Sequence, residues 1–228
     1  MNVFNDFLEF VFPKACVCCG TALLEEEKMI CLYCRYQLPT TNFHYQNENT
    51  AKKVFYGRIP LVNITSLFVF HKKNMTQKLL HQLKYKEKEE ISFVLGDWLG
   101  EELKTVAWAK AFDIVIPVPL HAKKLRERGY NQVAGFGENL AKHLGCSYSD
   151  KVLVKETPSA TQVFKNRSAR AEMKHDLFKL QNEALIANKH ILLVDDIITT
   201  GTTLETCAQI LLQAPNLQLS IATMAITL

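Results

Sequence analysis

Three almost uninterrupted apolar runs constrain the fold of this chain more than any other feature: residues 112–120, 190–196 and 219–228. They read "FDIVIPVPL", "HILLVDD" and "LSIATMAITL", and helical patterns lie between them at 131–145 and 203–213. Strands that are buried on both faces have no polar alternation, because helices cover each side of the sheet. The sequence therefore predicts an α/β fold, an open parallel sheet with helices on both faces.

The rest of the chain extends this pattern. We expect further strands at 66–70, 148–156 and 177–180, and helices at 75–86 and 91–112, the second long and amphipathic. Residues 35–58 are polar and predict a loop or extended linker. Two units follow: a zinc-ribbon-like N-terminal segment with its linker over 1–58, and the α/β domain over 59–228.

Five of the seven cysteines lie between residues 16 and 34. Cys16 and Cys19 form one Cys-x2-Cys pair, and Cys31 and Cys34 form a second. Two such pairs predict one tetrahedral Zn2+ bound by four thiolates, a structural site without an open position for water. Cys18 is then a spare thiol, and the alternative is that all five are free cysteines packed as small hydrophobic residues. We expect His44 to be a surface histidine.

The composition fits a cytoplasmic globular protein. The 228 residues carry a net charge of +4, too mild to indicate nucleic acid binding, and no run is long and apolar enough for a membrane span. Clustered cysteines in an odd number favour a metal in a reducing compartment over disulfides. Residues 1–15 predict a short amphipathic helix packed on the body, in preference to a signal peptide.

The strand "HILLVDD" ends in two acids, Asp195 and Asp196, and a threonine-rich loop follows over 199–203. Ligands of open parallel sheets bind at the carboxyl ends of strands. Backbone N–H groups at the next helix start, together with the hydroxyls, can surround a phosphate, while the carboxylates suit ribose hydroxyls or waters around a divalent ion. The pattern predicts a site for ribose 5-phosphate; the alternative is an ordinary helix cap and turn.

The stretch "ILLVDDIITTGTTL" resembles the 5-phosphoribosyl 1-pyrophosphate (PRPP) binding signature of type I phosphoribosyltransferases. Together with the four-cysteine segment and "PVPLHAKKLRERGYNQ", it makes nearly the whole chain similar to the ComF family. The resemblance implies a sheet of the type I phosphoribosyltransferase kind, with PRPP and Mg2+ as ligands. It implies that Asp195 and Asp196 contact the ribose and its Mg2+. It also implies a loop that binds the 5-phosphate, made of Thr199, Thr200, Gly201, Thr202 and Thr203.

The basic stretch after the 112–120 strand occupies the place of the family's pyrophosphate loop. Its residues are Lys123, Lys124, Arg126, Arg128 and Gly129, and a cluster of cations suits a departing pyrophosphate. A solvated basic helix start is the alternative interpretation. Lys84 also fits the family pattern.

Residues 157–178 are long, polar and basic, and the resemblance makes them a mobile loop that closes over the reacting centre. Thr161, Gln162 and Arg170 match the family's residues there. The family's usual Asn three residues after that Arg is Met173 in this chain, which puts any role of that position in doubt.

Two functions follow as hypotheses. In the first, a nitrogen nucleophile displaces pyrophosphate from PRPP, with an acceptor that the sequence does not name. In the second, the chain binds single-stranded DNA beside a competence helicase, with PRPP as a regulatory ligand. This hypothesis uses the basic segments 123–128 and 165–174 as phosphate contacts. Its stacking candidates are Phe43, Tyr45, Phe55 and Tyr56.

Overall fold

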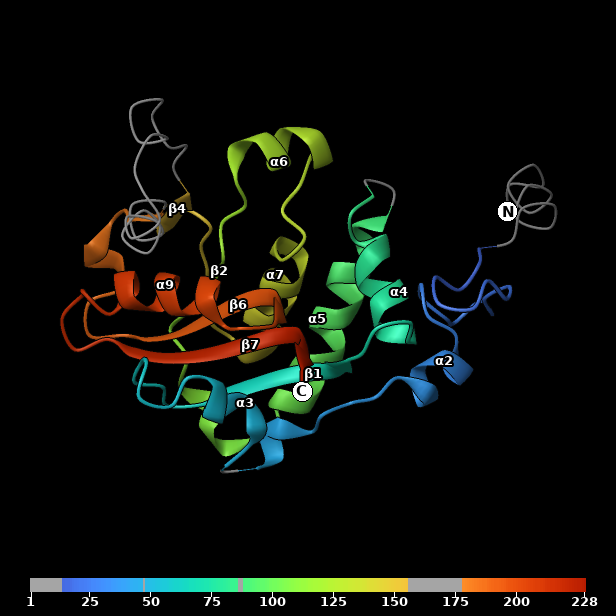
Figure 1. The fold of residues 1–228 in the computed structure, drawn as a ribbon, viewed down its shortest axis with the longest axis horizontal. Coiled ribbons are helices and arrows are strands. Elements are labelled where there is room, and N and C mark those ends of the chain that lie inside the picture. The colour runs from blue at the N-terminus through green and yellow to red at the C-terminus, as the bar shows by residue number, and fades with distance from the viewer. Residues whose placement is uncertain (1–13, 47, 86–87, 156–177) are drawn as a thin grey trace.

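A computed structural model describes residues 14–46, 48–85, 88–155 and 178–228. Within them a five-stranded, wholly parallel sheet has the strand order β1-β7-β6-β2-β3 (Figure 1). Its strands are β1 (Ile64–Phe70), β2 (Ile114–Pro117), β3 (Ser147–Tyr148), β6 (His190–Ile198) and β7 (Gln218–Thr227). The open parallel sheet that the sequence predicts is confirmed.

Helices cover both faces of this sheet (Figure 1). The α-helices are α2 (Leu32–Gln37), α3 (Thr50–Val54), α4 (Met75–Gln82), α5 (Glu90–Leu103), α6 (Ala122–Arg128), α7 (Ala134–Leu144) and α9 (Thr202–Leu211). The 3-10 helices are η1 (Phe43–Tyr45), η3 (Ala107–Ala111) and η5 (Glu183–Leu185). In the described part of the chain, no helix is long and apolar enough to cross a bilayer.

The side chains of β6 divide between two cores, as expected for a strand buried on both sides. Leu192 and Val194 pack in the core formed with α4, α5 and α7. Ile191 and Leu193 pack in the core formed with α3 and α9. The neighbours of the next two residues place these on opposite faces as well. The charge of Asp195 acts on Cys207 of α9, whereas the charge of Lys84, which follows α4, acts on Asp196.

Three predicted elements differ in extent from what the sequence indicated. The helix expected over 75–86 ends at Gln82. The helix expected over 91–112 ends at Leu103, and η3 follows after a turn. Thr105 closes this turn, since its hydroxyl donates to the Glu102 carbonyl at 2.7 Å and competes with continued helix. Val106 then adopts an extended conformation and is buried.

The strand expected over 148–156 divides into two pieces. Its first residues form β3, and its last form β4 (Leu153–Lys155), which pairs antiparallel with β5 (Phe178–Leu180) in a separate two-stranded sheet. A turn between them is stabilised by the Ser149 hydroxyl, which accepts the Lys151 N–H at 3.3 Å. Apolar periodicity does not show that a strand leaves one sheet for another.

Residues 35–58 form short helices against the sheet instead of the expected loop or extended linker. The chain after α2 runs along the outer edge of β1, where Thr41 N–H donates to the Leu67 carbonyl at 3.0 Å. His44, expected at the surface, is only 2% exposed, and its Nε2 lies 3.4 Å from Oε2 of Glu102. Burial lowers the pKa of His44 to about 4, so the ring is neutral at pH 7. The helix expected over 1–15 lies outside the described residues.

Candidate functional site

The carboxyl ends of β2 and β6 form the topological switch point of the sheet. These two strands are parallel neighbours, with Pro117 beside Val194 in register. After β2 the chain continues to β3 on one side, whereas after β6 it continues to β7 on the other. The loops that leave such a pair diverge and open a crevice, where open α/β sheets bind their ligands.

The acid pair is part of β6, which continues to Ile198, two residues beyond the predicted end. Asp195 and Asp196 are both half-buried. The Asp195 carboxylate accepts the backbone N–H of Asp196 at 2.9 Å. Burial raises the pKa of each carboxyl, and for Asp195 the charge of Asp196 raises it further. Two half-buried carboxylates on consecutive residues favour a ligand that supplies hydroxyls or positive charge.

The two carboxylates have different cationic neighbours, because they lie on opposite faces. The charges of Lys84 and Arg128 oppose the rise in the pKa of Asp196. Lys155 has the same effect on Asp195. Lys84 follows α4 and Arg128 ends α6, so both residues that the sequence singled out there lie near one carboxylate.

Sequence reasoning missed Lys155, at the end of β4. Its ammonium nitrogen lies 4.7 Å from the centroid of the Phe178 ring across the β4–β5 pair. Burial lowers the pKa of this lysine. The only signal in the sequence was a lysine closing an apolar run, which is too common to indicate a site.

A tight turn joins β6 to α9 and contains the threonine-rich loop. Gly201 caps α9 in the left-handed conformation, with φ 74°. The hydroxyls of Thr200 and Thr202 lie 3.0 Å apart, and Thr199, Thr200 and Thr203 are exposed. The first N–H groups of a helix have no intrahelical partner and the helix dipole favours an anion there. The turn therefore has the features of a phosphate-binding loop.

The basic stretch after β2 is a short exposed helix, α6, which projects from the body of the protein (Figure 1). His121 caps it, accepting the Lys123 N–H at 3.1 Å, and Gly129 ends it with φ 84°. Lys124 is close enough to Lys155 for the two charges to interact, whereas Arg128 hydrogen bonds to Gln132. The charge of Arg128 also acts on Asp196, so this end of α6 lies near the acid pair. Lys123 and Arg126 are exposed on the same helix.

Thr161, Gln162 and Arg170, which the resemblance assigns to a loop that closes over the reacting centre, lie outside the described residues, as does Met173.

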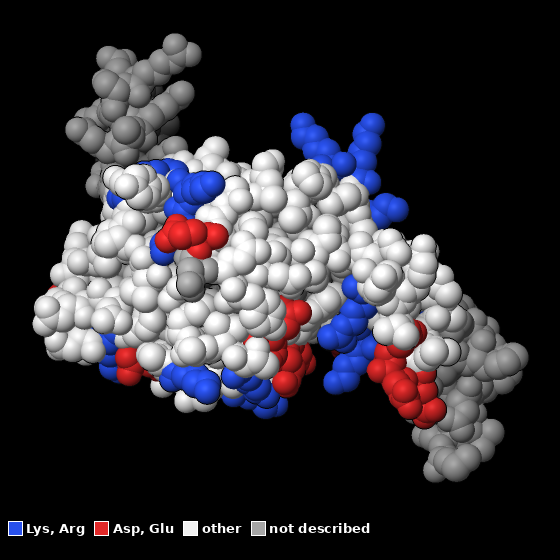
Figure 2. All heavy atoms as spheres, turned by 90° about the horizontal axis from the view of Figure 1, so that it is seen from below, with Lys and Arg blue, Asp and Glu red and all other residues white. Residues whose placement is uncertain are grey.

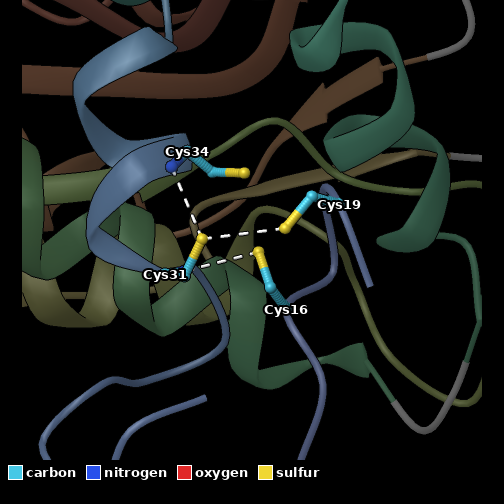
Figure 3. Close-up of side chains that lie close together, drawn as sticks. All are labelled: Cys16, Cys19, Cys31 and Cys34. Carbon is cyan, nitrogen blue, oxygen red and sulfur yellow. Dashed lines mark hydrogen bonds between the residues drawn. The ribbon is translucent and has the colours of Figure 1, made fainter. Parts of the chain in front are cut away.

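The four predicted zinc ligands come together in the N-terminal segment (Figure 3). Their sulfur atoms all lie within 4.8 Å of one another, and a tetrahedral Zn2+ needs sulfur atoms about 3.8 Å apart. Backbone N–H groups support the cluster: that of Cys31 donates to Cys16 Sγ at 3.3 Å. Four cysteines in this arrangement can bind a metal ion such as zinc.

Cys18 is not among the four clustered thiols. It is buried, and burial followed by the nearby charge of Cys16 raises its pKa to about 12, so it remains a neutral thiol. Cys207, a residue of α9, is buried in the core, and Cys146 is half-buried.

Residues 134–226 match the family described as phosphoribosyl transferase domain. The chain is 30% identical over 138 residues to the DNA utilization protein YhgH of Escherichia coli O157:H7, a match that covers 59% of this chain and 60% of that protein. It is 34% identical over 121 residues to the Competence protein ComFC of Streptococcus pneumoniae, covering 53% of this chain and 50% of that protein.

A third relative is the adenine phosphoribosyltransferase of Shewanella, 28% identical over 103 residues, with 42% of this chain and 55% of that protein covered. The chain therefore spans about half to three fifths of the length of these curated relatives. The family match includes the acid pair, the threonine-rich loop and α9, and the parallel sheet covered by helices agrees with the type I phosphoribosyltransferase fold.

Proposed function

From its similarity to ComF-like proteins and its match to the phosphoribosyl transferase domain family, we propose that the chain binds PRPP at the switch point between β2 and β6. One observation carries this proposal: the acid pair, the threonine-rich loop and the basic helix α6 all surround the carboxyl ends of two neighbouring strands. Each has the chemistry of one part of PRPP: carboxylates for the ribose hydroxyls, a helix start with hydroxyls for the 5-phosphate, and cations for the pyrophosphate.

In this proposal the carboxylates of Asp195 and Asp196 accept hydrogen bonds from the ribose hydroxyls. The loop from Thr199 to Thr203 binds the 5-phosphate with its backbone N–H groups and hydroxyls. The cations of α6, above all Lys124 and Arg128, bind the pyrophosphate.

Mg2+ arriving with PRPP would neutralise part of the pyrophosphate charge, and the carboxylate oxygens of the acid pair are hard donors that suit it. The protein's own contribution is to hold the ribose and to stabilise the negative charge that collects on the leaving group. In a transfer reaction, a nitrogen nucleophile forms a bond to ribose C1 as the bond from C1 to pyrophosphate breaks.

Calorimetry with Mg-PRPP tests the proposal. We expect the wild type to bind, and Asp195→Asn and Asp196→Asn each to weaken binding at least about tenfold, because each removes a charged acceptor. Glu183→Gln is the matched control: it removes one exposed carboxylate in η5, before the amino end of β6. Absence of binding by the wild type would refute the proposal.

A panel of bases and amines, screened for pyrophosphate release, then tests turnover. The wild type should release pyrophosphate with at least one nitrogen acceptor. Binding of Mg-PRPP without release from any member would favour the regulatory role of the ligand.

The four-cysteine cluster holds one Zn2+ in this proposal, as a structural ion. Four thiolates fill its coordination, so no position is left for a reacting water. Metal analysis of the purified protein should give one zinc per chain, and Cys34→Ser should reduce that amount.

We also propose an association with DNA utilization or uptake, which the names of two relatives support. Direct binding of single-stranded DNA is the alternative function. Two of its four stacking candidates, Phe43 and Phe55, are buried and cannot stack on a base. Tyr45 and Tyr56 are exposed. On the face shown in Figure 2, cationic and anionic side chains occur in small interspersed groups.

Fluorescence anisotropy with labelled single-stranded DNA tests this alternative. Direct binding through phosphates should weaken with rising salt, and Lys123→Ala with Lys124→Ala should weaken it further. Tyr56→Ala tests stacking, while Phe55→Leu is a control at a buried neighbour. Binding that is indifferent to salt and to all of these changes would argue against it.

A further inference from the structure

The segment just before β1 contacts the threonine-rich loop, although it lies outside the residues that match the phosphoribosyl transferase family. Arg58 makes this contact. Its Nη1 donates to the carbonyl of Thr200 at 2.9 Å and to that of Val54 at 2.9 Å. Its Nη2 pairs with the carboxylate of Glu205, in the first turn of α9. One guanidinium thus joins α3, the loop and α9.

The contact with Thr200 fixes the direction of one peptide group. A trans peptide is planar, so its carbonyl and its N–H point in opposite directions. Because the Thr200 carbonyl points toward Arg58, the N–H of Gly201 points to the other side of the loop. That N–H belongs to the group of donors proposed to bind the 5-phosphate.

Arg58 is itself poorly suited to bind the phosphate directly. Glu205 neutralises it, and the two side chains are only 31% and 22% exposed. Its guanidinium carbon lies 5.7 Å from the centroid of the Phe55 ring, and Phe55 is 1% exposed. The arginine is therefore held between a carboxylate, an aromatic ring and two carbonyls, in a geometry that a planar guanidinium satisfies better than an ammonium.

Phe55 holds the same turn from a second direction. A Cβ added to Gly201 would lie 2.9 Å from two atoms of the Phe55 ring and 3.0 Å from Val54. The turn is therefore packed tightly against α3 on the side that faces away from the proposed ligand.

We infer that Arg58 is a positioning residue of the phosphate-binding loop: by holding the Thr200 carbonyl and Glu205, it aims the Gly201 amide at the 5-phosphate. The inference rests on the proposed function, since it concerns the same site. It means that binding of the 5-phosphate also depends on Arg58, which lies between the four-cysteine cluster and β1.

Two ligands separate positioning from general stability. Ribose 5-phosphate probes the threonine-rich loop, whereas inorganic pyrophosphate with Mg2+ probes the cations of α6. Arg58→Met should weaken ribose 5-phosphate binding about tenfold, from the loss of hydrogen bonds to a charged donor, and leave pyrophosphate binding unchanged. Arg58→Lys should recover part of the loss, because an ammonium can reach one of the partners but cannot bridge them.

Lys52→Met is the matched control, because Lys52 is a cation of α3 whose partner is the exposed Glu48. We expect it to bind both ligands as the wild type does. Thermal melts of each variant accompany the binding data, measured on the full chain.

Three results would overturn the inference. The first is an Arg58→Met variant that binds ribose 5-phosphate as tightly as the wild type. The second is an equal loss of both ligands, which would indicate a structural role. The third, failure of the wild type to bind either ligand, would refute the proposed function itself and is recognisable without any variant.

Discussion

Replacing Gly201 with alanine should destabilise the protein more than the same change at Gly20, Gly57 or Gly145, three glycines of similar backbone conformation where an added Cβ would meet no atom within 4 Å. The backbone at Gly201 has φ 74°, a conformation that costs an L-residue about 1–2 kcal/mol. The new methyl would also lie 2.9 Å from the Phe55 ring, which is buried and cannot move away freely. Overpacking of this kind costs about 1–3 kcal/mol. The free energy of unfolding should therefore fall by about 2–5 kcal/mol.

Gly145, which ends α7, provides the matched control. Its φ is 67°, and a Cβ added there would meet no atom within 4 Å. Gly145→Ala should therefore cost only the backbone contribution of about 1–2 kcal/mol. The difference between the two variants measures the contact of the loop with α3, because both start from nearly the same backbone conformation.

Urea denaturation of both variants, followed by circular dichroism, measures the two costs. Phe55→Leu added to Gly201→Ala shortens the opposing side chain, so the double variant should be more stable than the sum of the single effects predicts, by about 1 kcal/mol. Equal costs for Gly201→Ala and Gly145→Ala, together with additive behaviour in the double variant, would refute the packing of α3 against the loop.

Three further predictions follow from the same structure. Asp195→Asn should raise the free energy of unfolding at pH 7 by about 1 kcal/mol. Burial raises the folded-state pKa of this carboxyl, so its stabilising contribution exists at low pH and is lost as pH rises through that pKa. Urea titrations at low pH should therefore show no gain over the wild type. Removal of the metal with a chelator, or Cys34→Ser, should lower the melting temperature by several degrees. Binding of Mg-PRPP should remain measurable, because the four-cysteine cluster is formed by α2 and the preceding turns, not by the residues of the proposed ligand site. Calorimetry at a temperature below the melt checks this. Tyr130→Phe should cost about 1–2 kcal/mol in urea denaturation and weaken Mg-PRPP binding slightly, because the buried hydroxyl donates to the Leu83 carbonyl beside Lys84.

Local patterns in the sequence predict the parallel sheet and most of its helices well. Residues 190–196 and 219–228 are apolar because helices cover both faces of β6 and β7, and this cause acts on each residue separately. The spacing of the four clustered cysteines is a local signal too, since each pair lies within one turn.

The predictions that were wrong concern residues 35–58 and His44, where the same local sequence can lie at the surface or be buried. Residues 35–58 are polar enough for a loop, yet Phe43, Ala51 and Phe55 are buried there against the sheet. Their burial depends on the edge of β1 and on α9, which are distant in the sequence. His44 was misplaced for the same reason, since its neighbour Glu102 lies on α5.

Contacts between distant segments also explain why the site was only partly predictable. The motif gave Asp195, Asp196 and the loop, because they are consecutive in the chain. Arg58 contacts Thr200 across 142 residues, and Lys155 approaches Asp195 from a separate small sheet. A single arginine or lysine in the sequence does not indicate which distant residue it contacts, so only the fold identifies Arg58 and Lys155.

The alternation of β6 changes how the acid pair is understood. From the sequence, Asp195 and Asp196 formed one subsite for a diol. In the fold, β6 continues through both residues, so one carboxylate lies on the face covered by α9 and the other on the face reached by Lys84 and Arg128. Arg128 belongs to α6, the proposed pyrophosphate side, whereas α9 begins at the proposed 5-phosphate loop. The two acids are therefore unequal in the proposed site: Asp196 would interact with the charge of the pyrophosphate, and Asp195 with the side toward the 5-phosphate loop.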